Sequence, residues 1–516
     1  MADLPRSEES APVRTDVVII GAGFGGVATA HNLRRRGVGK FVVLEQSDGL
    51  GGTWWDNRYP GAEVDVTSEL YSLSFAPHVF GRTHAGQAEI QAYMEKVVDD
   101  HGLRPHFRFG RRVESVRWAE KTHTYLVTAA DGGRWEARHV VSCVGQLNNP
   151  RYPDWPGLPE FHGPCFHTSR WDHSVDLAGK RVALVGTGST SAQVLPPLAE
   201  KAGHTYLFQR QPGWVMPKPD RDYTPDEIER LAASRWLVRR RRLQAFAQLE
   251  RMRRVARLGT RANRRMQALA EEYLRTAVPD AKLRAQLTPD YPYYGKRPVL
   301  TQYYYPALAR EDVTLVPRAV ERVTPTGVVD ASGAETDIDV LILATGFQPS
   351  RFLATFEVTG RGGTRLRDAW GAEPKSMLGM MAVGFPDFYV TYGPNTNGGV
   401  LTFTLERQAE WIADAIAHAE KTGTSLETKP GPVEIMDRLL VRRNDSFVWS
   451  RTGNNYYTSE SGRVVTQWPY SQKLYWLLTR LLRPALVCQA TARRETRRAE
   501  PAPAASDLLG MDPARD

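Results

Sequence analysis

Hydrophobic and polar positions follow one another along the chain in a pattern that predicts two strand–turn–helix units. Residues 15–21 (TDVVIIG) form a short apolar run that ends in glycine, residues 22–37 continue with helical spacing, and residues 41–46 (FVVLEQ) predict a second strand. Residues 180–194 (KRVALVGTGSTSAQV) repeat this order, and residues 205–211 (TYLFQRQ) supply the strand that follows. The pattern therefore predicts an α/β fold that contains two βαβ units.

The remaining segments divide the chain around these two units. Alternating residues from 107 to 145 predict a small antiparallel sheet with a return strand, and a proline-rich bridge follows. The stretch 224–290 is helical and basic, without a strand pattern, so it predicts an insertion. The expected parts are a flexible N-terminus (1–14), the first domain in two parts (15–150 and 348–492), the second domain in two parts (151–223 and 291–347), the helical insertion (224–290) and a disordered tail (493–516).

The chain is basic, with 67 Lys and Arg against 58 Asp and Glu and a formal net charge of +9. Much of this charge lies between Arg235 and Arg265, where apolar residues recur with helical spacing at Leu237, Leu243, Phe246, Leu249 and Met252. We interpret this stretch as an amphipathic helix with a solvated basic face whose long stems cover apolar surface. Peripheral contact with a membrane or a polyanion is the alternative. Because no nucleic-acid-binding motif accompanies the stretch, we expect no nucleic-acid partner.

Other compositional features exclude several classes of protein. No window approaches the roughly 18 apolar residues of a membrane span, and the first fourteen residues lack the apolar centre of a secretory signal. The three cysteines, Cys143, Cys165 and Cys488, are far apart and form no CxxC pair, and no metal-ligand cluster is present. We therefore expect a cytoplasmic protein without disulfides or a metal.

The first glycine turn has the spacing of a dinucleotide-binding fingerprint. Gly21, Gly23 and Gly26 form GxGxxG between strand and helix, where the backbone from Gly21 through Phe24 can approach a pyrophosphate at the helix N-terminus. Glu45 lies 24 residues after Gly21, at a position where a carboxylate suits ribose hydroxyls and repels a 2′-phosphate. This unit predicts NAD or FAD binding, and a turn that only packs helix on strand is the alternative.

The second glycine turn differs at two informative positions. Gly186 and Gly188 are followed by Ser191 in place of the third glycine, and the same count of 24 residues from Gly186 reaches Arg210. A guanidinium matches phosphate oxygens, so this exchange of acid for base favours NADPH, unless Arg210 is only an exposed charge. The fold prediction is therefore two Rossmann-like dinucleotide-binding domains, for FAD and NADPH, with a helical insertion. A flavin takes hydride from a nicotinamide, and with no dithiol or metal cluster, molecular oxygen is the simplest final acceptor.

Two longer segments carry a family resemblance. GGTWWDNRYPGAEVD, from Gly51 to Asp65, and FHGPCFHTSRWD, from Phe161 to Asp172, match in full the two sequence patterns of the Baeyer-Villiger monooxygenases, the type I, class B flavoprotein monooxygenases. The second pattern discriminates best, because related N- and S-oxygenating enzymes usually carry Tyr or Phe where Trp171 stands. The similarity covers roughly residues 15–480, and YGPNTN at 392–397 resembles the 4-hydroxyacetophenone monooxygenase branch.

The resemblance implies an NADPH- and O2-dependent oxidation of a small-molecule ketone to an ester or lactone through a C4a-peroxyflavin. Arg297 would lie over the flavin and stabilise the anions of the reaction, while Asp65 would hold it in place. The pair could instead be purely structural. Oxidation of an amine or a sulfide is the alternative reaction, and a reductase or an oxidase is the alternative from another class. The ketone and the oligomeric state stay open.

The resemblance also assigns cofactor contacts. Lys296 would join Arg210 at the 2′-phosphate, unless it is a surface charge, and His167 and Trp171 would couple domain motion to the nicotinamide. The residues expected to cradle the NADP pyrophosphate are Gly186, Thr187, Gly188, Ser189, Thr190 and Ser191. The residues expected around FAD are Gly21, Gly23, Phe24, Gly26, Glu45, Thr53, Trp54, Asp65, Tyr71, Val113 and Arg297.

Overall fold

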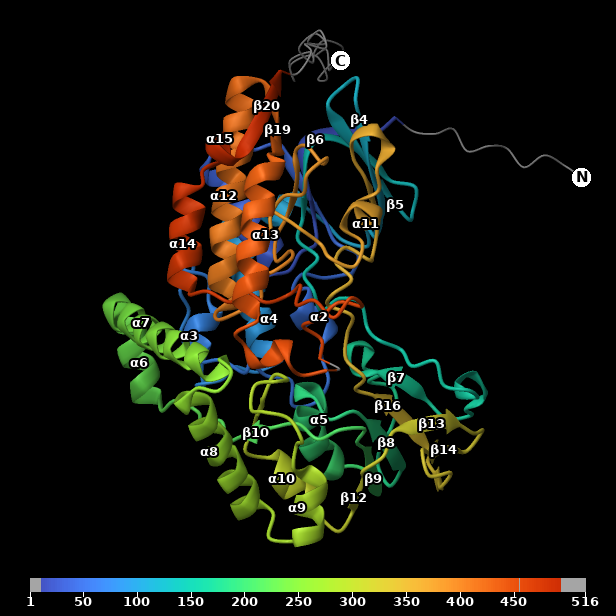
Figure 1. Ribbon diagram of the computed structural model, residues 1–516. Coiled ribbons are helices and arrows are strands. Elements are labelled where there is room, and N and C mark those ends of the chain that lie inside the picture. The colour runs from blue at the N-terminus through green and yellow to red at the C-terminus, as the bar shows by residue number, and fades with distance from the viewer. Residues whose placement is uncertain (1–10, 454, 493–516) are drawn as a thin grey trace, which may run out of the picture.

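The computed structural model describes residues 11–453 and 455–492, which form two sheet-based domains with helices around them (Figure 1). The first sheet has eight strands in the order β17-β4-β5-β6-β1-β2-β3, with β18 paired to β6. Its strands are β1 (Val13–Ile20), β2 (Phe41–Leu44), β3 (Phe107–Arg108), β4 (Val113–Ala119), β5 (Thr124–Ala129), β6 (Arg134–Ser142), β17 (Glu357–Thr359) and β18 (Phe388–Val390). The apolar run that ends β1 is buried because parallel neighbours flank it on both sides.

The segment predicted as a small antiparallel sheet with a return strand is part of this first sheet. β4 and β5 pair antiparallel, and β5 pairs antiparallel with β6. The long strand β6 also runs parallel to β1, so it joins the antiparallel strands to the parallel ones. Since β17 and β18 add to the same sheet, the chain returns to the first domain after it has formed the second.

The second sheet is entirely parallel, in the order β12-β9-β8-β16-β7. Its strands are β7 (Cys165–His167), β8 (Arg181–Val185), β9 (His204–Phe208), β12 (Val313–Val316) and β16 (Val340–Leu343). Three short antiparallel strands, β13 (Val320–Val323), β14 (Gly327–Asp330) and β15 (Glu335–Asp337), lie between β12 and β16 in the chain. The sequence pattern did not predict them, because these short strands lack the continuous apolar run that predicted β2.

Helices from the beginning and from the later part of the chain pack against one another beside the sheets. α1 (Phe24–Arg35) packs against the long helix α12 (Leu401–Thr422), and α13 (Pro430–Asn444) and α14 (Gln472–Leu481) stand beside α12 in Figure 1. α5 (Ser189–Ala199) follows β8 in the second domain. Further elements are α2 (Thr53–Asp56), α3 (Ser68–Tyr71), α4 (Gln87–Asp100), β10 (Val215–Met216), β11 (Val299–Leu300), α10 (Tyr304–Leu308), α11 (Leu366–Trp370), β19 (Thr424–Thr428), α15 (Pro484–Val487) and β20 (Cys488–Ala492).

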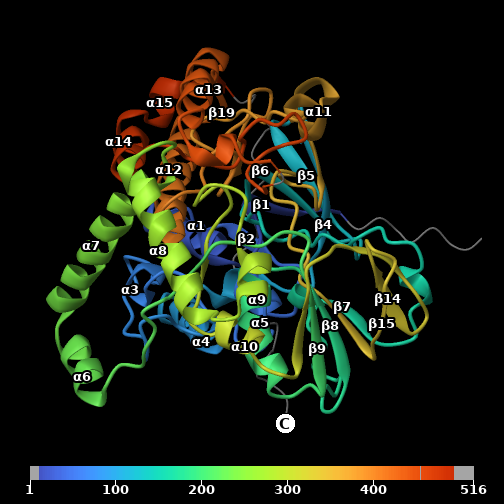
Figure 2. The ribbon, with the colours of Figure 1, turned by 60° about the horizontal axis from the view of Figure 1, so that its bottom comes forward.

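The basic stretch forms helices α6 (Pro225–Ala233), α7 (Arg235–Met252), α8 (Arg261–Ala277) and α9 (Ala281–Leu287). Helices α6 and α7 lie at the left edge of the molecule in Figure 2. The expected apolar stripe on α7 is wrong at Leu243, which is 69% exposed. The other four predicted residues are partly buried, and the Phe246 ring lies 5.1 Å from the Phe403 ring. Val238 and Arg242 also face inward, and the Arg242 guanidinium donates to the backbone oxygens of Glu69 and Ser72. Within residues 11–453 and 455–492, no helix is both long enough and apolar enough to cross a membrane.

Candidate active site between the two domains

A cleft of about 1640 Å³ lies between the two domains and receives both glycine turns. This volume exceeds the range of an ordinary single-ligand pocket, so the cleft has room for more than one ligand. Nearly all the predicted cofactor residues line it. The exceptions are Gly26 and Ser191, which lie inside α1 and α5 at equivalent positions behind the two turns.

The first glycine turn is held by close backbone contacts. Gly21 has φ +105°, and a Cβ on Gly26 would lie 2.0 Å from the Gly21 carbonyl oxygen, so neither position tolerates a side chain. The Glu45 carboxylate accepts hydrogen bonds from the backbone amides of Ala22 (2.7 Å) and Ser47 (2.9 Å). Burial raises the pKa of Glu45. Each carboxylate oxygen can still accept another bond, which fits the ribose of a bound dinucleotide.

Aromatic side chains enclose the same end of the cleft. The ring of Tyr71 meets the rings of Trp54 and Phe24 edge to face, each at 5.5 Å. Gly52, from the first family pattern, lies against Gly23 of the turn, where an added Cβ would come within 3.0 Å of the Gly23 Cα. The first family pattern and the first glycine turn therefore form one wall of the cleft, which fits an adenine dinucleotide that carries a flat isoalloxazine ring.

The second glycine turn lies across the cleft and is built in the same way. A Cβ on Gly186 would lie 2.3 Å from the carbonyl oxygen of Ala344, at the end of β16. Ser191, in the place of the third glycine, is fully buried and does not reach the cleft. The Thr187 hydroxyl donates to the carbonyl of Gln211 at 3.0 Å, which fixes the turn to the strand end that carries Arg210.

Two cations gather beside the second turn. Arg210 is exposed, and the Lys296 ammonium donates to the Gln211 side-chain oxygen and lies 5.2 Å from the Tyr291 ring centroid. Burial lowers the pKa of Lys296, and the neighbouring Arg210 lowers it further. Mutual repulsion of this kind is relieved by a shared anion, so the pair fits the 2′-phosphate of NADPH.

Arg297 and Asp65 form an ion pair across the domain boundary. Asp65 comes from the first domain, and Arg297 precedes strand β11. The carboxylate of Asp65 raises the pKa of Arg297 well above its ordinary value, so the guanidinium is permanently charged. Because the Arg297 side chain is 43% exposed and both residues line the cleft, the cation is accessible from the cleft.

The two family patterns meet at the domain boundary. Arg170, from the second pattern, forms an ion pair of 3.0 Å with Asp56, from the first. Tyr59 donates its hydroxyl proton to the Gln193 side chain on α5 at 2.8 Å. A Cβ on Gly61 would lie 2.4 Å from the backbone oxygen of Gln193, so the loop after α2 requires glycine where it crosses α5.

His167 lies outside the cleft lining and is fully buried. Its Nδ1 accepts from the Ser169 amide at 3.1 Å, so Nε2 carries the proton that reaches the Gly346 carbonyl oxygen at 3.1 Å. Burial lowers the pKa of His167 to about 4. The ring therefore holds the turn at Gly346, which lines the cleft, and its role in domain motion stays a prediction.

Several cleft residues were not predicted from the sequence. Tyr392, Asn397 and Tyr456 line the cleft, and the Tyr392 hydroxyl donates to the Asn397 side chain at 2.8 Å. Tyr392 and Asn397 belong to the YGPNTN segment, and its family resemblance assigns no role to these residues. Tyr456 belongs to no motif. The fold of the chain after α13 brings it to the cleft.

Two dinucleotide folds that face each other across one cleft, with a fixed cation between them, define a two-nucleotide oxidoreductase. A family model described as pyridine nucleotide-disulphide oxidoreductase matches residues 18–257. A Baeyer-Villiger monooxygenase of Streptomyces coelicolor is 37% identical over 88% of this chain and 88% of its own length. A Baeyer-Villiger monooxygenase of Pseudomonas aeruginosa is 35% identical over 90% of this chain and 89% of its own length.

Solved structures agree with these relatives. A closed crystal structure of cyclohexanone monooxygenase has a TM-score of 0.86 and 28% identity, and covers 93% of this chain and 100% of that one. An oxidised steroid monooxygenase bound to NADP has a TM-score of 0.82 and 29% identity over the same shares. The chain belongs to the Baeyer-Villiger monooxygenase family, and it is an FAD- and NADPH-dependent monooxygenase as its motifs predict.

Proposed function

We propose that the protein converts a small-molecule ketone into an ester or lactone, with consumption of one O2 and one NADPH. The observation that carries this proposal is the Asp65–Arg297 pair in the lining of a cleft that two dinucleotide folds share. FAD, when bound, would supply the hydride acceptor and the ring that activates oxygen. Family membership supports the reaction, and one of the solved relatives is a cyclohexanone-bound cyclohexanone monooxygenase.

The side chains account for the charge that this reaction develops. Attack of an oxygen nucleophile on a ketone carbonyl places a negative charge on the carbonyl oxygen, and a fixed guanidinium stabilises that charge without having to reorganise. Arg297 supplies this cation, and Asp65 fixes its position. Because Arg297 stays charged at every relevant pH, it acts by electrostatic stabilisation and transfers no proton.

We further propose that the two sheets divide the cofactors between them. Residues 15–150 and 348–492 would hold FAD through the first glycine turn, Glu45 and the aromatic wall, and residues 151–223 and 291–347 would hold NADPH through the second turn. Arg210 and Lys296 would bind the 2′-phosphate. This division is supported by the origin of the strands in each sheet and by the two cations beside the second turn.

The test is the variant Arg297→Ala. It should retain FAD and accept hydride from NADPH under anaerobic conditions at close to the normal rate, since neither step needs the cation. After an oxygen pulse with a cyclic or an aryl ketone, ester formation should fall by about 10²- to 10³-fold, as when one oxyanion donor is removed.

The matched control is Arg275→Ala, which removes an arginine from an exposed helical ion pair and should leave ester formation unchanged. Normal ester yield from Arg297→Ala would remove the arginine from the mechanism. A sulfide and an amine are offered beside the ketone, because oxidation of only these substrates would favour the heteroatom-oxygenating alternative.

Two further proposals concern the protein's surroundings. The dependence on NADPH and the three free cysteines support a cytoplasmic location. The exposed surface of α7 and α14 supports peripheral contact with anionic lipid: both helices present a tryptophan beside arginines, at Trp236 and Trp476. A cationic surface with exposed aromatic and leucine side chains has the chemistry of an interfacial membrane contact.

A further inference from the structure

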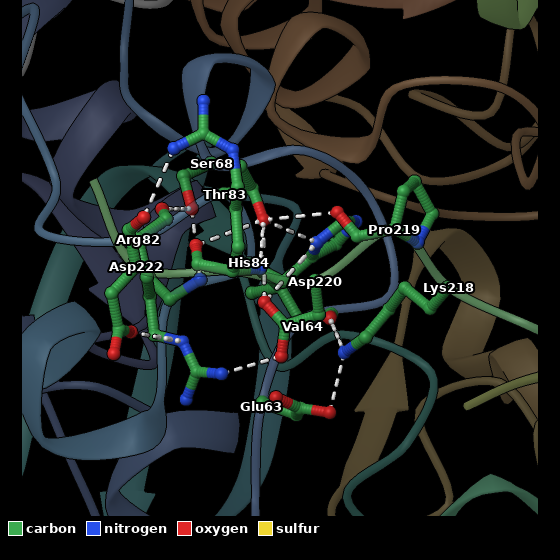
Figure 3. A network of polar contacts seen from close by, with 12 residues as sticks. Glu63, Val64, Ser68, Arg82, Thr83, His84, Lys218, Pro219, Asp220 and Asp222 are labelled. Carbon is green, nitrogen blue, oxygen red and sulfur yellow. Dashed lines mark hydrogen bonds and ion pairs between the residues drawn. The ribbon is translucent and has the colours of Figure 1, made fainter. Parts of the chain in front are cut away.

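A lysine buried at the domain boundary contacts the segment that leads into Asp65 (Figure 3). Lys218 is only 2% exposed, and its ammonium donates to the Glu63 carboxylate and, at 3.3 Å, to the backbone oxygen of Val64. Burying an ammonium group costs free energy unless the group is paired and hydrogen-bonded. The contacts with Glu63 and Val64 therefore hold the Lys218 side chain in this place. Glu63 and Asp65 both line the cleft.

One short ribbon of the second domain carries both cations that hold this segment. β10 and β11 pair in parallel, with Val215 opposite Val299. Lys218 lies just beyond the end of β10, and Arg297 lies just before the start of β11. The ribbon therefore presents Lys218 to Glu63 and Val64 while it presents Arg297 to Asp65.

Ion pairs also hold the segment that follows Lys218. The Asp220 carboxylate, fully buried, pairs with Arg82 at 2.5 Å and lies 3.6 Å from Nδ1 of His84. Burial lowers the pKa of His84 to about 4, and Lys218 contributes to this shift, so the ring is neutral near pH 7. Lys218 and Arg82 face the carboxylates of Glu63 and Asp220, and the exposed Asp222 carboxylate lies 3.5 Å from Arg82. The network joins residues 63–84 to residues 218–222 (Figure 3).

We propose that Lys218 is a positioning residue for the reaction: by holding Glu63 and the Val64 carbonyl, it sets Asp65 in register with Arg297 across the domain boundary. The inference rests on the function proposed above for the Asp65–Arg297 pair. Lys218 touches neither cofactor nor substrate in this scheme. It acts through Asp65, and the ribbon makes correct placement of Asp65 depend on correct docking of the two domains.

The first test compares Lys218→Met, which removes the charge, with Lys218→Arg, which keeps it. Lys218→Met should retain FAD and leave KM for the ketone nearly unchanged, while kcat for ester formation falls about 10- to 100-fold, because a displacement of about 1 Å costs that much. Lys218→Arg should recover most of the rate. Lys96→Met removes an exposed lysine ion pair and is the matched control. An unchanged kcat in Lys218→Met would overturn the proposal.

The second test separates positioning from simple loss of stability. Lys218→Met leaves Glu63 buried and unpaired, so the double variant Lys218→Met/Glu63→Gln provides a folded form without either charge. A double-mutant cycle then combines Lys218→Met with Asp65→Asn. If Lys218 acts through Asp65, Lys218→Met should add little to the loss already caused by Asp65→Asn. Independent losses, whose factors multiply, would contradict the proposal.

A third measurement does not depend on ester formation. The Val64 amide donates to the Ala85 carbonyl oxygen at 3.1 Å, so hydrogen exchange in residues 60–68 reports the order of the segment. Exchange there should become at least several-fold faster in Lys218→Met and stay normal in Lys96→Met. If the unaltered protein made no ester from any ketone, the proposed function would fail, and unchanged exchange in Lys218→Met would separately overturn the role of Lys218.

Discussion

Arg210 and Lys296 are the residues proposed to bind the 2′-phosphate of NADPH, and each charge can be removed alone. We expect Arg210→Ala to raise KM for NADPH by about 10- to 100-fold, the value of one or two hydrogen bonds to a charged group. KM for NADH should change little, because NADH lacks the 2′-phosphate. The measurement is NADPH and NADH oxidation at saturating oxygen. Equal increases for both coenzymes would show that Arg210 does not bind the phosphate.

At the scale of single residues, the sequence predicts what local spacing determines. The count of 24 residues reaches both Glu45 and Arg210, because strand, turn and helix lengths are similar in the two units. No such count identifies Lys218. The sequence around Lys218 indicates neither that its side chain is buried nor that it pairs with Glu63. Arg242 shows the same limit: in sequence it belongs to a basic run, and in the structure it is an inward-facing side chain.

At the scale of elements, the loop after α2 and helix α5 meet at Gly61, where a side chain has no room. Gly61→Ala should lower the free energy of unfolding by about 1–3 kcal/mol, because it combines a positive φ with a Cβ 2.4 Å from the Gln193 oxygen. The matched control is Gly37→Ala, at a similar φ of +79° with no atom within 4 Å. Thermal and denaturant unfolding measure both variants.

The difference between the two variants isolates the contact with α5, since the backbone strain is common to them. If Gly61→Ala proves no less stable than Gly37→Ala, the loop does not press on α5 and the close approach is unimportant. The family pattern allows glycine or methionine at this position, and in this chain the close approach to the Gln193 oxygen explains the glycine. Without the fold, a glycine between a proline and an alanine indicates only a turn.

Elements with a strong period were predicted correctly, and weak ones were not. The buried strands β1 and β8 and the helices after them follow from continuous apolar runs and glycine turns. The predicted apolar stripe on α7 is wrong at Leu243, which is exposed, while Leu237, Phe246, Leu249 and Met252 are partly buried. Helical spacing therefore predicts the helix and most of its covered side, but it gives no sign that Val238 and Arg242 also face inward.

At the scale of the whole molecule, the net charge is +9, and helices α7 and α14 each expose a tryptophan beside an arginine. α7 and α14 both lie at the left edge in Figures 1 and 2, and the Gln472 amide at the start of α14 donates to the Glu250 carboxylate on α7 at 3.0 Å. Trp236 is 67% exposed and Leu481 is 58% exposed. Arg240 and Arg480 lie over the two tryptophan rings at 5.5 Å and 4.6 Å.

This surface predicts salt-sensitive binding to anionic membranes. The full chain with FAD bound should co-sediment with phosphatidylglycerol vesicles at low salt and much less with phosphatidylcholine vesicles, since the arginines need anionic headgroups. Trp236→Ser/Trp476→Ser should weaken binding at least about tenfold, because each indole loses apolar contact with the lipid. Tyr303→Ser, an exposed aromatic on the second domain, is the control. Equal sedimentation with both lipids, or a dimer that hides the tryptophans in solution, would contradict the lipid contact and assign this face to another partner.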